Sequence, residues 1–219
     1  TVTDIGSTKA NVVRAVPADQ RDRFVGGHPI CGAEARGAQH ARAELLDGAT
    51  YFLTPVADTD PSRYARLHSL VAQLGARPVA IDPAAHDRLV ALTSHLPHVL
   101  ANVLIAQAGE ATIDGHDPLA AAGGSFRDMT RVAGANARIW VDIFMDNRDA
   151  LLGALDEHAR RLDEVRAALA AGDAGQIARW IGGAAEARRR ALRHAYPESA
   201  DDLHKVRVHI PDRPGAISG

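Results

Sequence analysis

The chain has 219 residues, of which 46% are hydrophobic and 24% charged, and its formal net charge is −2. This composition is typical of a water-soluble globular protein of one or two domains. The near-neutral charge disfavours nucleic acid as a main partner, and we expect the arginine run at 188–190 to be a solvated helix face. No apolar run approaches the roughly 18 residues that a bilayer span needs, so the sequence predicts no membrane partner.

Cysteine usage and the chain ends give two further expectations. Cys31 is the only cysteine, which excludes an internal disulfide and fits a reducing compartment, so we expect a cytoplasmic protein. The chain begins in a β-rich segment that resembles a strand already under way, and residues 205–219 resemble the start of another. We therefore expect the sequence to be part of a longer chain.

Residues 1 to about 82 alternate β-rich runs with a helical pattern. The runs VTDIG, RFVGGHP, TYFLTPV and RPVAID predict strands. Between the last two, SRYARLHSLVAQLGA predicts an amphipathic helix that ends at Gly75. This alternation favours βαβ units and a mainly parallel sheet.

From about residue 83 the strand signals stop and helical patterns take over. PAAHDRLVALTSHLPHVLANVLIAQAGE has apolar residues at helical spacing behind Pro83. After a glycine-rich loop, a long helical stretch is predicted from about 137 to 171, ending at Gly172, and a further helix from about 174 to 194. The fold class is therefore α/β followed by all-α, with domains at 1–82 and 83–200 and the start of a third unit at 204–219.

The first helix of the second domain is apolar on nearly all sides, which predicts burial in a core or in a homodimer. Pro97 lies inside it and predicts a kink, because its ring would clash with the carbonyl of Thr93. A polar stripe also runs along it, and two interpretations stay open: an internal network with trapped water, or the lining of a polar pocket. The stripe consists of Asp87, Ser94, His98 and Asn102.

His28 is the strongest candidate for a catalytic residue, although a loop histidine without a function is the alternative. It follows a short strand, and ligands of open parallel sheets bind beyond the carboxyl ends of the strands. Gly26 and Gly27 remove side-chain bulk around it. Ser7 ends an earlier predicted strand in a similar way, and its hydroxyl would orient the imidazole if the two meet.

Two other motifs have a chemical and an ordinary interpretation. Arg131 follows a glycine-rich loop and suits two-point binding of a carboxylate, whereas a surface arginine without a ligand is the commoner case. His95 and His98 in SHLPH have a spacing that fits zinc. Because HExxH is absent and the cysteine is distant in sequence, we expect no metal site.

The motifs together resemble those of the prephenate and arogenate dehydrogenases of tyrosine biosynthesis. The matching runs are VTDIGSTK, FVGGHPICGAE, YFLTP, HDRLVALTSHLPHVLANVL, GGSFRDMTRVA and IWVDIFMDN, in the order of that family. The resemblance implies that 1–82 is the C-terminal portion of a Rossmann-like NAD(P)-binding domain. It also implies that 83–200 is a helical substrate-binding and dimerisation domain.

The resemblance assigns roles to individual residues. His28 is implied as the catalytic base, and Ser7 as the residue that positions it beside the nicotinamide, with Gly6 as a further cofactor contact. Arg131 is implied to bind a substrate carboxylate. The remaining implied substrate residues lie in SHLPH and the glycine-rich loop: Ser94, His95, His98, Gly124 and Asp128.

Three features depart from or extend the family pattern. The dinucleotide fingerprint GxGxxG is absent from residues 1–219 and is expected to precede Thr1; the expected cofactor is NAD, with NADP as the alternative. Glu34 would pair with the ammonium of arogenate, or is a solvent-exposed glutamate. VRVHIPDRPGAIS resembles the start of an ACT domain, which would make tyrosine a feedback ligand.

The resemblance therefore implies an NAD(P)-dependent prephenate dehydrogenase that decarboxylates prephenate oxidatively to 4-hydroxyphenylpyruvate. Two alternatives stay open. One is an arogenate dehydrogenase, which would produce tyrosine. The other is a non-catalytic dimeric protein that senses a ligand.

Overall fold

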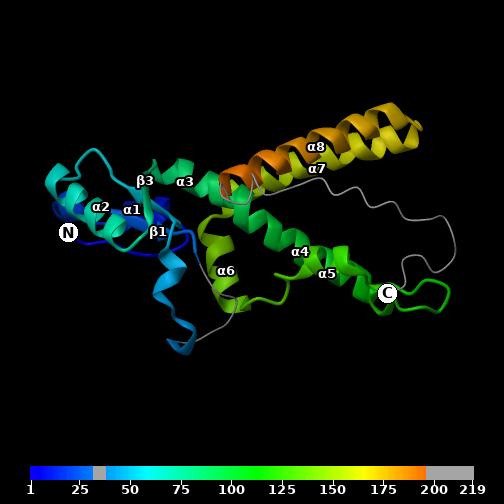
Figure 1. Ribbon diagram of the computed structural model, residues 1–219, viewed down its shortest axis with the longest axis horizontal. Helices are drawn as coiled ribbons and strands as arrows, with labels where there is room; N and C mark the ends of the chain where they lie inside the picture. The colour runs from blue at the N-terminus through cyan, green and yellow to red at the C-terminus, as the bar shows by residue number, and fades with distance from the viewer. Residues whose placement is uncertain (32–37, 196–219) are drawn as a thin grey trace, which may run out of the picture. The chain divides into compact units, whose positions relative to one another are not determined.

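A computed structural model describes residues 1–31 and 38–195. The chain divides into two compact units, Thr1–His158 and Ala159–Gly219. The first unit contains, in order, α1 Ala10–Ala15, η1 Ala18–Arg23, β1 Gly26–Pro29, η2 Ala38–His40, η3 Ala43–Leu46, β2 Thr50–Thr54, α2 Pro61–Gln73, β3 Arg77–Ala80, α3 Pro83–Val90, η4 Ala91–His95, α4 Leu96–Glu110, η5 Pro118–Ala121, α5 Gly124–Thr130 and α6 Ala137–Asp146 (Figure 1). α7 Arg148–Ala170 continues into the second unit, where α8 Ala174–Ala195 follows.

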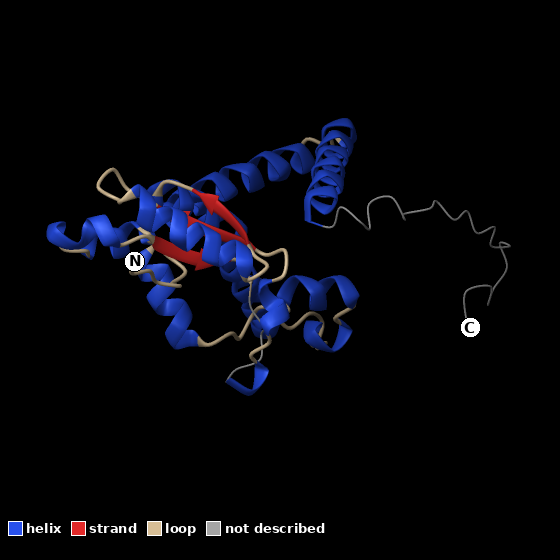
Figure 2. Cartoon of the chain, turned by 60° about the vertical axis from the view of Figure 1, so that its left-hand side comes forward, coloured by secondary structure: helices blue, strands red, loops and turns tan. Residues whose placement is uncertain are grey.

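The sheet has three strands in the order β1-β2-β3, surrounded by helices (Figure 2). β2 and β3 are parallel, as expected, but β1 pairs with β2 in the antiparallel direction, so the expectation of a mainly parallel sheet is wrong for this pair. The predicted strand VTDIG forms only an isolated parallel bridge between Val2 and Phe24. Strand direction depends on connections that a local residue pattern does not contain.

The hydrophobic core of the first unit lies between the sheet and α2. Its members are apolar side chains with at most 7% exposure: Val25, Tyr51, Leu53, Leu67, Val71 and Ala76. The Asp60 carboxylate accepts the N–H groups of Ser62 and Arg63 and so caps α2. The helix ends before Gly75, whose φ of +85° few other residues adopt, so the predicted end is confirmed.

The glycine pair of β1 allows the N-terminal segment to pack directly on the strand. A Cβ on Gly26 would lie 2.3 Å from Thr54 Oγ1, and one on Gly27 would lie 2.6 Å from the backbone oxygen of Asp4. Both distances are far below van der Waals contact. The glycines therefore make room for other parts of the protein, whereas the sequence suggested that they clear space around His28.

The predicted helix from Pro83 to Glu110 contains a change of helix type. Asp82 caps α3 by accepting Ala85 N–H at 2.9 Å. The segment η4 is π-helical, and Leu96 N–H donates to Ala91 O, five residues back. Pro97 follows in the first turn of α4. The proline thus follows an interruption of the α-helix by a π-helical segment, and the predicted kink stays a prediction.

This helical stretch also corrects the expectation about apolar runs. Pro83–Glu110 has 28 residues, and an 18-residue window within it has a mean hydropathy of 1.6, so it has the length and composition of a membrane span. Core helices of water-soluble proteins have these properties too. His86, Asp87 and His95 on this stretch are buried among polar partners, which favours a core helix.

The long helical stretch predicted from 137 to 171 is divided at Asn147 into α6 and α7. α7 and α8 run side by side as a hairpin (Figure 1), with Gly172 at φ +65° in the turn. Both the stop at Gly172 and the helix that follows are confirmed. Several large apolar side chains of the hairpin are exposed: Leu162, Leu169, Trp180 and Ile181.

We expect Gly27→Ala to lower the free energy of unfolding by about 1–3 kcal/mol, because the new methyl group must displace backbone at Asp4. Gly153→Ala is the control: nothing lies within 4 Å of its Cβ position, and alanine in a helix should stabilise by up to about 1 kcal/mol. Urea unfolding of both variants measures the difference. Unchanged stability of Gly27→Ala would contradict the packing described.

Candidate active site

The strand register places His28 opposite Phe52 on neighbouring strands. His86, from α3, packs with its ring edge-on against both: the ring centroids lie 5.1 Å apart for His28 and 5.4 Å apart for Phe52. His28 therefore lies inside β1, near its end, whereas the sequence suggested a loop after the strand. Its surroundings are set by the sheet and by α3.

A chain of hydrogen bonds runs from His28 into the interior. His28 Nδ1 lies 2.9 Å from His86 Nε2, and His86 Nδ1 lies 2.8 Å from Asp87 Oδ1. His86 is 0% exposed and Asp87 6%. We call these three residues the His28–His86–Asp87 chain. Its arrangement, in which a carboxylate orients one imidazole that contacts another, is typical of sites that direct a proton.

The Asp87 carboxylate also holds the start of α1. Oδ1 accepts Lys9 N–H and Oδ2 accepts Ala10 N–H, each at 2.8 Å. Burial alone would raise the pKa of Asp87, but the hydrogen bonds from His86 and from these two amides together lower it. Asp87 is therefore ionised at neutral pH.

The pKa of His28 is lowered from 6.5 to about 4, first by burial and then by the nearby His86, Lys9 and His95. The imidazole is therefore uncharged at pH 7 and retains a lone pair. An uncharged imidazole is the form that accepts a proton in general base catalysis.

Asp4 holds the segment that contains Gly6 and Ser7 against β1. Its Oδ2 accepts Gly6 N–H at 2.9 Å and its Oδ1 accepts Gly27 N–H at 3.0 Å. The buried Lys9 ammonium pairs with the same carboxylate. Ser7 and His28 thus each follow an amide that is bonded to Asp4, which brings the two segments together. No hydrogen bond within residues 1–31 and 38–195 joins the Ser7 hydroxyl to His28.

The histidines of SHLPH lie around Trp140 of α6. His95 is 1% exposed, and its Nδ1 accepts from Asn147 Nδ2 at 3.1 Å. Asn147 Nδ2 also donates to the backbone oxygen of Asp87 at 2.8 Å, which links His95 to the His28–His86–Asp87 chain. His98 stacks on Trp140, and its buried Nδ1 has no hydrogen-bond partner among the described residues. No group of three or more potential metal ligands occurs in the part of the chain that the structure describes.

The other predicted substrate residues lie away from this network. Ser94 is half-buried in η4. Gly124 and Asp128 on α5 are exposed, as is Arg131 at its C-cap, and α5 packs against α4 (Figure 1). Of the predicted polar stripe, Asp87 is buried whereas Asn102 is exposed. Glu34 and the predicted ACT segment lie outside the described residues.

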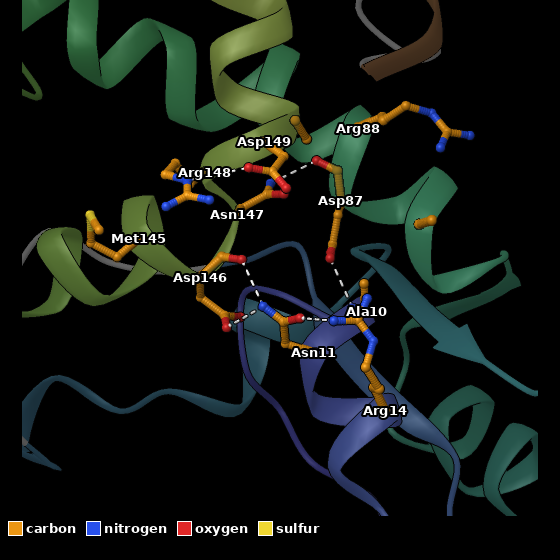
Figure 3. A pocket seen from close by; sticks show the side chains of 12 residues that line it. Ala10, Asn11, Arg14, Asp87, Arg88, Met145, Asp146, Asn147, Arg148 and Asp149 are labelled. Atoms are coloured by element: carbon orange, nitrogen blue, oxygen red, sulfur yellow. Dashed lines mark hydrogen bonds and ion pairs between the residues drawn. The ribbon is translucent and has the colours of Figure 1, made fainter.

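A cleft of about 610 Å³ opens on the other side of Asp87, between α1, α3 and the junction of α6 and α7. Figure 3 shows Asn11 reaching across it to Asp146, and Asn147 bonded to Asp87. The Asp146 carboxylate accepts from Asn11 Nδ2 at 2.8 Å and also from Thr8 Oγ1. These contacts join the helical part of the unit to the N-terminal segment.

Sequence reasoning missed two residues that organise the site, namely His86 and Asn147. His86 precedes Asp87 in the matched motif, and a histidine–aspartate doublet behind a proline-started helix was the available signal. Asn147 had only a weak signal, because an asparagine that interrupts a helical pattern normally marks a helix end. Its role depends on a contact with residues 52 and 60 positions earlier.

Comparison with known proteins defines the class of protein. Residues 1–80 match the family model described as prephenate dehydrogenase, nucleotide-binding domain. Residues 82–183 match the model described as prephenate dehydrogenase, dimerization domain. Prephenate dehydrogenase of Bacillus subtilis is 34% identical over 99% of this chain and 59% of its own length. Cyclohexadienyl dehydrogenase of Zymomonas mobilis is 35% identical over 78% of this chain and 59% of its own length.

Solved structures agree with this assignment. The arogenate dehydrogenase of Synechocystis is 33% identical, with a TM-score of 0.77 over 87% of this chain and 69% of its own. The prephenate dehydrogenase of A. aeolicus, in complex with hydroxyphenyl propionate and NAD⁺, is 28% identical, with a TM-score of 0.82 over 87% of this chain and 67% of its own. The chain belongs to the prephenate dehydrogenase family. It spans 59% of the length of the B. subtilis relative.

The pKa values of His28 and His95, both lowered to about 4, predict how stability depends on pH. Burial is the main cause in both cases, so each histidine is uncharged in the folded state, whereas the unfolded chain binds the proton below about pH 6.5. Folding stability should therefore be full above pH 6.5 and should fall as the pH is lowered towards 4.

Urea unfolding between pH 7.5 and 4.5 measures this dependence. We expect His95→Asn to reduce the proton uptake that accompanies unfolding by about one proton, so that stability varies less with pH. His116→Asn, at an exposed position, is the control for a histidine-to-asparagine substitution elsewhere in the unit. Equal pH dependence in wild type and His95→Asn would show that His95 is not held in its uncharged form.

Proposed function

We propose that the protein is an NAD(P)-dependent prephenate dehydrogenase that converts prephenate to 4-hydroxyphenylpyruvate and CO₂. The observation that carries the proposal is His28: a half-buried, uncharged imidazole whose Nδ1 is bonded to His86. It lies in the GGHP run of a chain that belongs to this family. The other ring nitrogen, Nε2, is then the atom that accepts the proton of the substrate hydroxyl.

The proposed reaction removes a hydride from C4 of the ring and a carboxylate from the opposite carbon. As Nε2 of His28 takes the hydroxyl proton, electron density moves to C4 and expels the hydride. The bond to the ring carboxylate then breaks, CO₂ leaves, and its electron pair completes the aromatic ring. The proton returns from His28 to the oxygen, which becomes the phenol. With both carboxylates ionised, no net proton is released.

In this proposal, residues of the helical region bind and orient the substrate. Arg131 binds a substrate carboxylate through its two-pronged guanidinium, and Gly124 and Asp128 belong to the loop and helix that precede it. Ser94, His95 and His98 line the substrate pocket. The buried Nδ1 of His98 supports this role, because an unpartnered buried nitrogen costs about 1–3 kcal/mol unless a ligand or water bonds it.

The described residues fit one end of a nicotinamide cofactor. Gly6 N–H is bonded to the Asp4 carboxylate beside the strand that carries His28, which supports a role for Ser7 in contacting the nicotinamide and positioning His28. NAD⁺, when bound, supplies the hydride acceptor. Residues 1–219 contain no GxGxxG run for the pyrophosphate. The choice between NAD and NADP depends on residues other than these.

A homodimer in the cytoplasm is the proposed state of the protein. The match of residues 82–183 to a dimerization domain supports it, as does the exposure of large apolar side chains on α4, α6 and α8. These include Val103, Ile139, Val141, Trp180 and Ile181. Exposed apolar area of this extent is typical of surfaces that a second subunit covers.

Arogenate is the alternative substrate. The likeness to an arogenate dehydrogenase and to a cyclohexadienyl dehydrogenase supports it. Arogenate carries an ammonium group where prephenate carries a keto group, and Glu34 is the proposed partner of that ammonium. Feedback by tyrosine through an ACT domain that starts near 204 also remains a proposal.

His28→Asn should reduce kcat by about 10²-fold or more, because general base catalysis contributes about that much. The assay follows NADH formation spectrophotometrically, with prephenate and with arogenate, using protein expressed from its full coding sequence. His68→Asn on the exposed side of α2 is the control and should retain normal turnover. Near-normal turnover of His28→Asn would remove this residue from the chemical step.

Arg131→Ala should raise KM for the substrate about 10-fold or more and change kcat less, because the guanidinium contributes binding in the ground state as well as in the transition state. Arg127→Ala, an exposed arginine one turn earlier on α5, is the matched control and should leave KM unchanged. The same KM for Arg131→Ala and wild type would exclude Arg131 from the binding site.

A further inference from the structure

We infer that His86 and Asp87 act as positioning residues that hold His28 in one tautomer, with the hydrogen on Nδ1 and the lone pair on Nε2. The inference rests on the proposed function and deepens it, because it explains which nitrogen of His28 accepts the substrate proton. The supporting observation is a chain of two hydrogen bonds. Asp87 Oδ1 lies 2.8 Å from His86 Nδ1, and His86 Nε2 lies 2.9 Å from His28 Nδ1.

Asp87 determines which atoms donate and which accept along this hydrogen-bond chain. Its carboxylate is ionised, and an ionised carboxylate only accepts hydrogen bonds. The amides of Lys9 and Ala10 already donate to it. His86 Nδ1 must therefore carry the hydrogen of the bond to Asp87 Oδ1.

The next step concerns the second ring nitrogen of His86. The side chain of His86 is 0% exposed and packs against Phe52, and its Nε2 lies 2.9 Å from His28 Nδ1. An imidazole with its one hydrogen on Nδ1 has an acceptor at Nε2. In this inference His86 presents that acceptor, and the hydrogen between the two histidines belongs to His28.

His28 is left with its lone pair on Nε2, the nitrogen farther from the backbone. In free histidine the Nε2–H tautomer is the more common one, and in that form Nε2 could not take a proton. The chain therefore selects the productive form of the ring before the substrate binds. When Nε2 takes the proton, the imidazolium donates to His86, with the Asp87 carboxylate behind it, and this arrangement stabilises the new charge.

A contribution from Ser7 is the rival explanation for the orientation of His28, as the family resemblance implies. Among the described residues, 1–31 and 38–195, no hydrogen bond joins Ser7 to a ring nitrogen of His28. The Nδ1 atom of His28 is instead bonded to His86 Nε2. The two explanations differ in which residue controls the tautomer. A measurement of the tautomer itself separates them.

The test is nitrogen-15 NMR of the histidine side chains in protein expressed from its full coding sequence, at pH 7, with His28→Asn used to assign the signals. We expect wild-type His28 as the Nδ1–H tautomer. In His86→Leu, which removes the acceptor, we expect a mixture with Nε2–H, kcat lower by at least about 10-fold, and substrate KM within about 3-fold of wild type.

His86→Gln is the matched control, because its Oε1 takes the place of Nε2 and accepts from His28 Nδ1–H. It should restore the Nδ1–H tautomer and most of kcat. Ser7→Ala should leave the tautomer unchanged.

The outcomes separate the inference from the proposed function. A hydrogen on Nε2 of His28 in the wild type overturns the inference whatever the activity, and so does an unchanged tautomer in His86→Leu. If His86→Leu does not fold, the wild-type tautomer and the His86→Gln variant still decide. A wild type with hydrogen on Nδ1 but no activity on prephenate or arogenate overturns the proposed function and supports the tautomer assignment.

Discussion

The buried carboxylate of Asp87 is the interaction on which the first unit depends. It accepts hydrogen bonds from His86 and from the first amides of α1, and its own backbone oxygen accepts from Asn147 between α6 and α7. One residue thus joins the N-terminal segment, α3 and the junction of α6 and α7, and its neighbour His86 contacts His28 of the sheet. A buried charge is tolerated only with such complete pairing, and loss of one partner costs several kcal/mol.

This arrangement explains why structural roles and the proposed catalytic roles fall on the same residues. The hydrogen bonds that hold α1 against α3 also lower the pKa of Asp87 and so keep it ionised. The ionised Asp87 carboxylate accepts a hydrogen bond from His86 and orients its ring. In the inferred arrangement His86 in turn selects the tautomer of His28. Asn147 acts similarly on His95, because its amide donates to Nδ1 and leaves the hydrogen of an uncharged ring on Nε2. With the tautomer inferred for His28, the two histidines carry their hydrogens on opposite ring nitrogens, which suits the proposed site, where one group accepts a proton and another donates a hydrogen bond.

Part of the candidate site could be anticipated from the sequence, and the roles of its residues stay predictions. His28 was identified from the glycine pair before it, and its uncharged state agrees with a base, but its bonded partner proved to be His86 where the sequence suggested Ser7. The polar stripe of the long helix was predicted with a constant helical period. The π-helical segment η4 changes that period between Asp87 and Asn102, so one end of the stripe is buried and the other exposed.

The sequence by itself determined the local features: where helices begin after Pro83 or end at Gly75 and Gly172, which segments are helical, and the family to which the chain belongs. These follow from backbone preferences and motifs within a few residues of one another. Only the tertiary structure decided the antiparallel direction of β1 and the hydrogen-bond partner of His28. The physical reason is that strand pairing and side-chain hydrogen bonds join residues far apart in sequence, 58 positions for His28 and His86, and no local pattern encodes which distant group fills a given site.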